Sequence, residues 1–215
     1  MSRATTRAVS KHMSKPGPGY CLITPLLLIL GTNLVMAEDN GYQARGAHFT
    51  ADGSVELPQG YRGWIHVGSR LSPSHVSILD NKKTPTPEFY NVYVEPYTYS
   101  YFKQTGTWPD GAQIVKEFSS TQSGANCDAA TGICQRPEGS AFFQQDFMGI
   151  GYMVKDKKRF KTLEGNWGYF SSSHKKPPYE KTSPLRSKEQ CAGCHIANKS
   201  QTVDYVFTNA IIGLR

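Results

Sequence analysis

Two thiols and an imidazole stand close together in the stretch SKEQCAGCHIANKS, near the C-terminus of the chain. Cys191 and Cys194 are separated by two residues, and His195 follows directly. Ser187 and Gln190 precede the histidine at the spacing of a capping box, in which two side chains satisfy backbone N–H groups at a helix start. The pattern predicts a helix that begins just before Cys191 and brings the three reactive side chains onto one turn.

CxxCH is the attachment signature of a c-type haem, because the two thiols can add to the haem vinyl groups while the adjacent histidine ligates the iron. A zinc site is one alternative, but it needs a fourth ligand, and the chain has no second CxxC and no HxxxH. A redox disulfide is the other, but it usually follows the first strand of a thioredoxin-like unit. We therefore expect one covalent haem c per chain, with Cys191 and Cys194 as attachment points and His195 as proximal iron ligand.

The N-terminal segment, residues 1 to 37, has the composition of a secretory signal. Four basic residues and no acidic one precede or flank the apolar run CLITPLLLIL, and small Ala37 is the expected cleavage position. The run is shorter than the about 20 apolar residues that span a bilayer, although an uncleaved anchor is the alternative. We expect a periplasmic protein without a membrane span after cleavage, consisting of one haem domain, residues 38 to 215.

The charge of the expected mature protein is close to balanced. Removal of residues 1 to 37 takes four of the 24 basic residues and none of the 17 acidic ones, which leaves a net charge of +3 instead of +7. A basic surface for nucleic acid is therefore not supported, and we expect no nucleic-acid partner.

Two further cysteines, Cys127 and Cys134, lie in the short stretch CDAATGIC. Export to an oxidising compartment favours a disulfide between them, and a metal clip is the alternative. Closing this short loop would stabilise the fold by about 2.5 kcal/mol in the chain-entropy description of cross-links.

The rest of the chain alternates short apolar segments with turn residues. Pro96 can open a helix that Gly106 ends, and residues 155–165 are expected to form a short helix and turn. The expected strands are rich in β-branched and aromatic residues: they are residues 61–69, 89–95, 112–118, 146–154 and 166–173. This order predicts a single α+β domain with a mostly antiparallel sheet, a few short helices, and the CxxCH motif on a C-terminal helix.

Lys116 stands in the expected strand AQIVKEF, where alternate side chains share a face. Ile114, Lys116 and Phe118 then point together, and Glu117 points the other way. Burial of an unpaired ammonium among apolar neighbours is costly. Taken by itself, the pattern also fits an edge strand whose lysine extends to water.

The sixth position of a haem iron is filled by Met or His in most electron carriers. The mature chain offers no such residue in a motif that marks a ligand, which predicts an open site for a small molecule. An electron carrier with Met148 or Met153 on the iron is the alternative. The other candidates are His48, His66, His75 and His174.

Seven segments carry a resemblance to a known family, in the same order and spacing. They are YRGWIHVGS, VYVEP, DGAQIVKEF, VKDKKRF, GNWGYF, CAGCH and DYVFT. From about His48 to the C-terminus the chain resembles the cytochrome P-460 family of exported mono-haem proteins, which is related to the beta-type cytochromes c prime. The loop between Cys127 and Cys134 looks like an insertion relative to that family.

The resemblance implies a function and a role for Lys116. In the family, the lysine of the VKE strand is joined covalently to a meso carbon of the porphyrin, and the matching residue is Lys116. The typical chemistry is oxidation of hydroxylamine, with nitric oxide as a ligand, whereas the cytochrome c prime relatives bind nitric oxide with little turnover. The resemblance also implies a homodimer and a redox partner such as a soluble cytochrome c.

The chain departs from the family on the distal side of the expected haem. Gly151 stands where members that oxidise hydroxylamine carry a glutamate, and Tyr90 stands where an arginine is expected. Strand alternation would place Phe147, Gly149 and Gly151 on one face, so Tyr90, Phe147 and Gly151 are the expected distal-pocket residues. Loss of the glutamate predicts an oxidoreductase with weak hydroxylamine turnover, or a nitric oxide binding protein.

Overall fold

The computed structural model describes residues 46–72, 76–77, 79 and 82–215. The expected signal segment and His75 lie outside these ranges. The described residues belong to one compact unit, Asp39–Arg215. Within them, no helix is long and apolar enough to cross a membrane.

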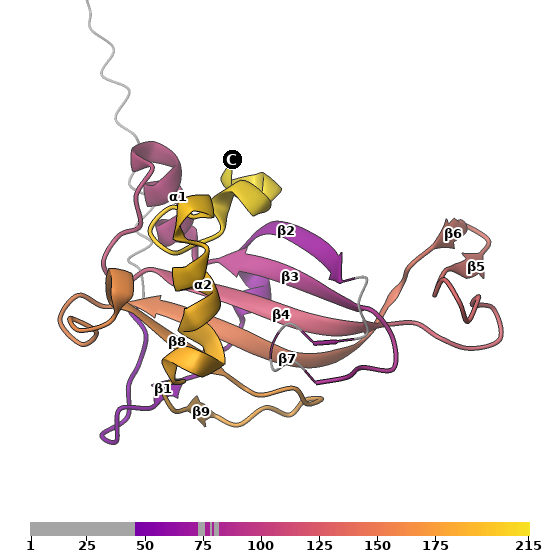
Figure 1. Cartoon of the computed structure of the whole chain (residues 1–215), viewed down its shortest axis with the longest axis horizontal. Helices are drawn as coiled ribbons and strands as arrows, with labels where there is room; N and C mark the ends of the chain where they lie inside the picture. The colour runs from indigo at the N-terminus through magenta and orange to yellow at the C-terminus, as the bar shows by residue number, and fades with distance from the viewer. Residues whose placement is uncertain (1–45, 73–75, 78, 80–81) are drawn as a thin grey trace, which may run out of the picture. The chain divides into compact units, whose positions relative to one another are not determined.

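A five-stranded antiparallel sheet forms the centre of this unit (Figure 1), in the order β2-β3-β4-β7-β8. With its short helices, the unit confirms the predicted α+β class. Its middle strand, β4, has a hydrogen-bonded neighbour on each side, so both of its edges are covered. The five strands are β2 (Ile65–Ser72), β3 (Glu88–Val94), β4 (Gln113–Thr121), β7 (Gln144–Lys155) and β8 (Trp167–Ser171).

Two small two-stranded sheets flank the central one. β1 (Val55–Glu56) pairs with β9 (Thr182–Ser183). β5 (Cys134–Arg136) and β6 (Gly139–Ala141) form a hairpin that projects from one end of the central sheet (Figure 1). A disulfide joins Cys127 to Cys134 at the base of this hairpin, as the sequence predicted.

The helix α1 (Pro96–Thr105) has the boundaries that its sequence specifies. Pro96 occupies the first helical position, where a missing N–H costs nothing. The Glu95 carboxylate accepts hydrogen bonds from the N–H groups of Tyr97 and Thr98. Gly106 ends the helix in the left-handed conformation, which glycine adopts without steric cost.

The remaining helical segments are short. The helix expected within residues 155–165 is wrong: residues 157–162 form turns, followed by one 3-10 turn. Near the C-terminus, the π-helical η3 (Lys188–Ala192) leads directly into α2 (Gly193–Ala197). The 3-10 turns are η1 (Tyr61–Gly63), η2 (Glu164–Asn166), η4 (Lys199–Gln201), η5 (Thr208–Ala210) and η6 (Ile212–Leu214).

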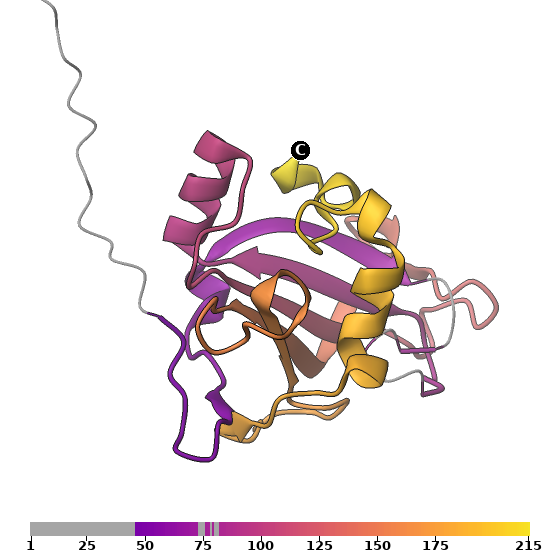
Figure 2. The same ribbon diagram turned by 60° about the vertical axis from the view of Figure 1, so that its left-hand side comes forward.

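Apolar side chains cover both faces of the sheet. We call the face that carries Ile114, Lys116 and Phe118 the lysine face. α2 and the C-terminal segment lie over the lysine face in both views (Figures 1 and 2), with Cys191 and Ala192 packed against its core. Because β4 is central and covered on both faces, the edge-strand interpretation of Lys116 is wrong.

The opposite face is closed behind Lys116 by a buried polar cluster. Glu117 is fully buried there and accepts hydrogen bonds from the Tyr61 hydroxyl and the Arg62 guanidinium. This cluster fixes η1 to the back of β4 and confirms that Glu117 points away from Lys116. It also compensates the buried carboxylate, which would otherwise be costly.

Phe147 does not lie on the lysine face, contrary to the expected alternation. Phe118 pairs with Gly149, but the next residue, Ser119, pairs with Phe147, so β7 contains one extra residue at this point. Such a β-bulge interrupts the alternation of side chains. The Arg62 guanidinium lies 4.0 Å from the Phe147 ring centroid, and 37% of Phe147 is exposed. Phe147 is therefore no longer a distal-pocket candidate.

Candidate haem site

The CxxCH residues lie at the junction of η3 and α2. Ser187 and Gln190 form the predicted capping box, in which the Ser187 N–H donates to Gln190 Oε1 at 3.0 Å. Cys191 is partly buried and Cys194 is exposed, and both thiols are free. Two free thiols about one helical turn apart can both react with the same planar molecule, such as one haem through its vinyl groups.

His195 is oriented by a hydrogen bond that it donates to the loop between η4 and η5. Its Nδ1 lies 2.7 Å from the carbonyl oxygen of Tyr205, and because a carbonyl only accepts, Nδ1 carries the proton. The Nε2 lone pair is then available to a metal. The imidazole ring packs between Tyr169 and Phe207, each with its centroid 4.9 Å away. Burial lowers the pKa of His195, which favours the neutral form that binds metals.

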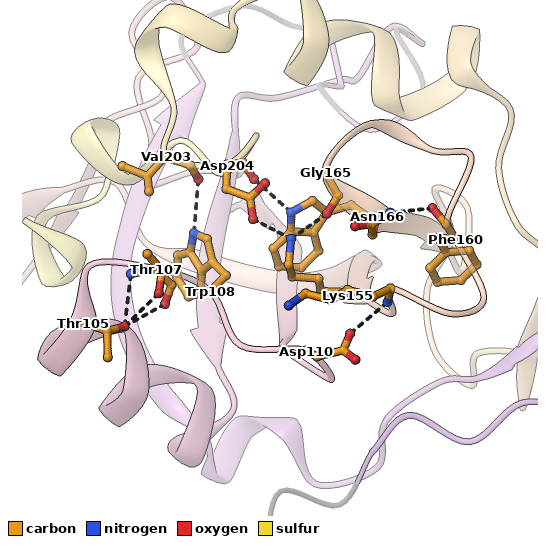
Figure 3. A network of polar contacts seen from close by, with 12 residues as sticks. Thr105, Thr107, Trp108, Asp110, Lys155, Phe160, Gly165, Asn166, Val203 and Asp204 are labelled. Atoms are coloured by element: carbon orange, nitrogen blue, oxygen red, sulfur yellow. Dashed lines mark hydrogen bonds and ion pairs between the residues drawn. The ribbon is translucent and has the colours of Figure 1, made fainter.

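The loop that supplies this carbonyl is itself anchored (Figure 3). The indole N–H of Trp108 donates to the carbonyl of Val203 at 3.1 Å. The indole N–H of Trp167 donates to the carbonyl of Asp204 at 2.8 Å, and the Asp204 carboxylate pairs with Lys155 Nζ at 2.6 Å. These contacts fix residues 203–204, so the next carbonyl meets the histidine in a defined position.

Lys116 lies on the lysine face in an aromatic environment. Its neighbours across the sheet are Val92 in β3 and Gly151 in β7. Its Nζ lies 4.1 Å from the Tyr90 ring centroid and 5.4 Å from that of Phe118. No carboxylate in the described part of the chain forms an ion pair with this lysine.

The electrostatics of Lys116 connect it to the CxxCH motif. Burial, and to a smaller extent the charge of Arg70, lowers the pKa of Lys116 to about 8, while Cys194 opposes the shift. Lys116 in turn contributes to the lowered pKa of His195. The lysine and the motif, which are 75 to 79 residues apart in sequence, are therefore close enough to sense each other's charge.

The two glycines of β7 on the lysine face differ in the space around them. A Cβ atom at Gly149 would clash with the carbonyl oxygen of Ser173, and its φ of +134° also favours glycine. A Cβ atom at Gly151 would lie 3.7 Å from Leu79 Cδ1, an ordinary contact. Gly151 can therefore accept a side chain, whereas Gly149 is required by the backbone that crosses it.

Two residues of this surface could not be assigned from the sequence. Arg70 pairs with Tyr90 across β2 and β3 and interacts electrostatically with Lys116. The register of β2 shifts between His66 and Gly68, so simple alternation does not show which face Arg70 occupies. Leu79 lies in the loop between β2 and β3, where no periodicity marks it. The carbonyl of Tyr205 does belong to a recognisable segment, DYVFT.

Taken together, these residues fit a covalently held haem. The chain offers two free thiols, a neutral imidazole with a free Nε2, and an apolar and aromatic surface. It also offers a buried amine for which the described residues provide no counter-ion, and bonding to a porphyrin carbon would remove the need for one. Tyr90 and Gly151 lie on the same surface as this amine, and Phe147 does not.

Comparison with known proteins agrees with this arrangement. Residues 58–208 match the family described as cytochrome P-460. The matched range includes β2 to β8, Lys116, the CxxCH motif and the Tyr205 loop. No curated protein is significantly similar to the chain. The chain belongs to the cytochrome P-460 family, and it is a c-type haem protein of that family.

Proposed function

We propose that this protein is an exported haem protein that binds nitric oxide and hydroxylamine at an open iron site and oxidises hydroxylamine slowly. Cys191 and Cys194 hold one haem covalently, and His195 ligates the iron. Lys116 forms a third covalent bond, to the porphyrin. The observation that carries the proposal is the buried, uncompensated amine of Lys116 beside the CxxCH motif.

Different residues of the chain have different roles at this site. The iron supplies the position at which a small nitrogen ligand coordinates. Tyr205 and its anchored loop hold the imidazole of His195 in place, and the Lys116 bond limits movement of the macrocycle, one of the means by which a protein alters haem electronics. Tyr90, Phe118 and Leu79 provide an aromatic and apolar wall that restricts water near the ligand.

The chemistry is slow because no acid–base group lies directly across from Lys116. Oxidation of hydroxylamine removes protons as well as electrons, and a positioned general base typically contributes about 10²–10⁴-fold. Gly151 has no side chain to take a proton. Nitric oxide brings no proton, so its binding is not affected by this loss.

An electron carrier with a methionine on the iron is the second candidate. Met153 lies on the lysine face and packs against its core. However, Met153 pairs across the sheet with Tyr169, whose ring contacts His195. Met153 is thus next to a residue that packs on His195, the histidine that would hold the iron, and this position favours an open site over methionine ligation.

Export, dimerisation and a redox partner belong to the same proposal. The Cys127–Cys134 disulfide supports an oxidising compartment such as the periplasm. A homodimer and a soluble cytochrome c as electron acceptor are carried over from the family resemblance.

An optical spectrum of the Lys116→Ala variant tests the proposal. We expect the native ferrous protein to show a strongly red-shifted Soret band and the variant to show a band near the ordinary c-type position, because the porphyrin bond is lost. Mass spectrometry of haem peptides should find the haem joined to the Lys116 peptide in the native protein only.

Lys157→Ala serves as the matched control, since Lys157 is an exposed lysine. Its spectrum should equal that of the native protein. An unchanged Soret band in Lys116→Ala would refute the crosslink, and a low-spin six-coordinate spectrum of the native protein would refute the open site.

A further inference from the structure

A buried ionisable pair that has no role in the haem site described above lies on the lysine face. Glu88 begins β3 and is 3% exposed. It lies two positions before Tyr90 in the same strand, so both side chains point to the lysine face. His174 follows β8, and its Nε2 lies 2.5 Å from Glu88 Oε1. The two residues are 86 positions apart in sequence.

One oxygen of this buried carboxylate has no partner. Glu88 Oε1 is bonded to His174, but no donor within the described ranges reaches Oε2. An unpaired buried carboxylate oxygen is costly, because the water that it loses is not replaced. Buried polar atoms without a hydrogen-bond partner are uncommon in proteins, and a catalytic role is a frequent reason for them. A carboxylate with one oxygen held by histidine and the other free can accept a proton.

The pair lies on the side of Lys116 that is away from the proximal histidine. Along β7, Met153 neighbours Tyr169 and therefore His195, while Gly151 is directly across from Lys116. Gly149 comes next, and a Cβ atom there would clash with the carbonyl oxygen of Ser173, the residue just before His174.

Glu88 itself is displaced from Tyr90 by about 7 Å along the strand, as two residues of a β-strand are. The order along the lysine face is therefore His195, then Lys116 with Gly151, then Gly149, and last the Glu88–His174 pair.

The groups around the pair are suited to hold a carboxylate. Ser72 and Ser120 are the cross-strand neighbours of Glu88 and are uncharged. The ionisable groups at neighbouring positions are Tyr90 on its own strand, Arg70 on β2 and His174 beyond β8. Asp146 of β7, whose N–H donates to the hydroxyl of Ser120, is ion-paired with Lys176.

We propose that Glu88 and His174 form the proton acceptor of the distal pocket, in place of the absent carboxylate at Gly151. The inference rests on the proposed function, because it needs a ligand at the iron. When a protic ligand such as hydroxylamine or hydrogen cyanide binds, the proton it releases moves to Glu88 Oε2, and His174 holds the carboxylate in position. No electron moves in this step.

Binding kinetics of hydrogen cyanide to the ferric holoprotein test the pair without relying on turnover. Cyanide binds as the anion, so the association rate depends on a group that takes its proton. We expect Glu88→Gln to lower this rate by about 10²-fold at neutral pH, the lower end of a general-base contribution, and to flatten its dependence on pH. His174→Gln should produce a smaller decrease in the same direction, because it loses only the positioning of the carboxylate.

Nitric oxide binding to the ferrous protein is the companion measurement, because this ligand brings no proton. It should be equal in the native protein and in both variants. Glu180→Gln is the matched control, since Glu180 is an exposed glutamate paired with Lys175 on the segment that follows His174. Its cyanide kinetics should equal those of the native protein.

Failure of the Glu88–His174 inference and failure of the open iron site give different results. If Glu88→Gln and His174→Gln bind cyanide as fast as the native protein, the pair is only a structural link between β3 and the segment after β8, and the inference fails. If Glu88→Gln does not fold, His174→Gln decides, because His174 is more exposed. A native protein that binds neither nitric oxide nor cyanide would instead overturn the open iron site.

Discussion

At the scale of single residues, the lysine face combines a reactive amine with a missing acid. Lys116 is buried among Tyr90 and Phe118 and has no counter-ion in the described part of the chain. The cost of burying an ammonium explains why the pKa of this amine is lowered, and the free amine is the form that can bond to carbon. Directly across the sheet, Gly151 leaves the opposite position without a side chain.

Gly151→Glu should restore a carboxylate at this position. The substitution is sterically acceptable, because the first added carbon meets only Leu79 at an ordinary contact distance. We expect hydroxylamine oxidation to rise by about 10²-fold with an artificial electron acceptor, as a general base typically provides. The Soret band should change little, since the haem attachments are untouched.

Gly151→Gln is the matched control for this prediction, because glutamine has the same shape but cannot take a proton. It should leave the turnover near the native level. Equal gains with glutamate and glutamine would show that polarity or pocket shape, and not proton transfer, limits the reaction. Fast turnover in the native protein would show that the Glu88–His174 pair already supplies all the base that the oxidation needs.

At the scale of elements, the loop between η4 and η5 determines how the proximal histidine is held. It is anchored by two indole N–H groups, from Trp108 and Trp167, and by the ion pair between Lys155 and Asp204. Lys155 is 7% exposed in its side chain, and its Nζ also donates to the carbonyl of Gly165. The end of β7 thus supports the residue that orients the iron ligand.

Lys155→Met should weaken this support. Removing one partner of a buried pair leaves the other uncompensated, and such losses cost several kcal/mol. Asp204 is 31% exposed in its side chain and can regain some water, so we expect a decrease of about 2–3 kcal/mol in the free energy of unfolding. The haem reduction potential should also shift, because the hydrogen bond to His195 changes.

Lys188→Met provides the comparison, because Lys188 forms an exposed pair with Glu164 on the surface. Its loss should cost less than about 1 kcal/mol. Urea unfolding of both variants measures the difference. Equal losses, or an unchanged reduction potential in Lys155→Met, would contradict the proposed role of the loop.

At the scale of the whole molecule, the haem surface and the cystine hairpin are separate parts. The β5–β6 hairpin projects from one end of the sheet (Figure 1), and its disulfide closes a loop between Cys127 and Cys134. The CxxCH helix lies over the lysine face instead. A cross-link acts mainly on the loop that it closes, so it should not control the geometry of the haem site.

The double variant Cys127→Ser and Cys134→Ser should therefore keep a native haem spectrum. We expect its free energy of unfolding to fall by no more than about 2.5 kcal/mol, and limited proteolysis to cut residues 124–133 faster than in the native protein. Loss of the Soret intensity in this variant would show that the hairpin also supports the haem site.

Some features of this protein were determined by the sequence alone, because they depend on local interactions. The boundaries of α1 follow from Glu95, Pro96 and Gly106, and the start of η3 follows from the capping box at Ser187 and Gln190. The strands were recognisable from β-branched and aromatic runs, and the disulfide from a short cysteine spacing. Local propensity misled within residues 155–165, where turns replace the expected helix, and at residues 61–63, which form the 3-10 turn η1 instead of the start of the expected strand.

Other features were decided only by the tertiary structure, because they depend on strand register and on contacts between distant segments. A bulge at one position of β7 moves Phe147 to the opposite face, and a shift in β2 conceals the place of Arg70. The central position of β4 decides that Lys116 is buried. The meeting of Glu88 with His174 requires β3 and the segment after β8 to be brought together by folding, and nothing in either local sequence specifies the other.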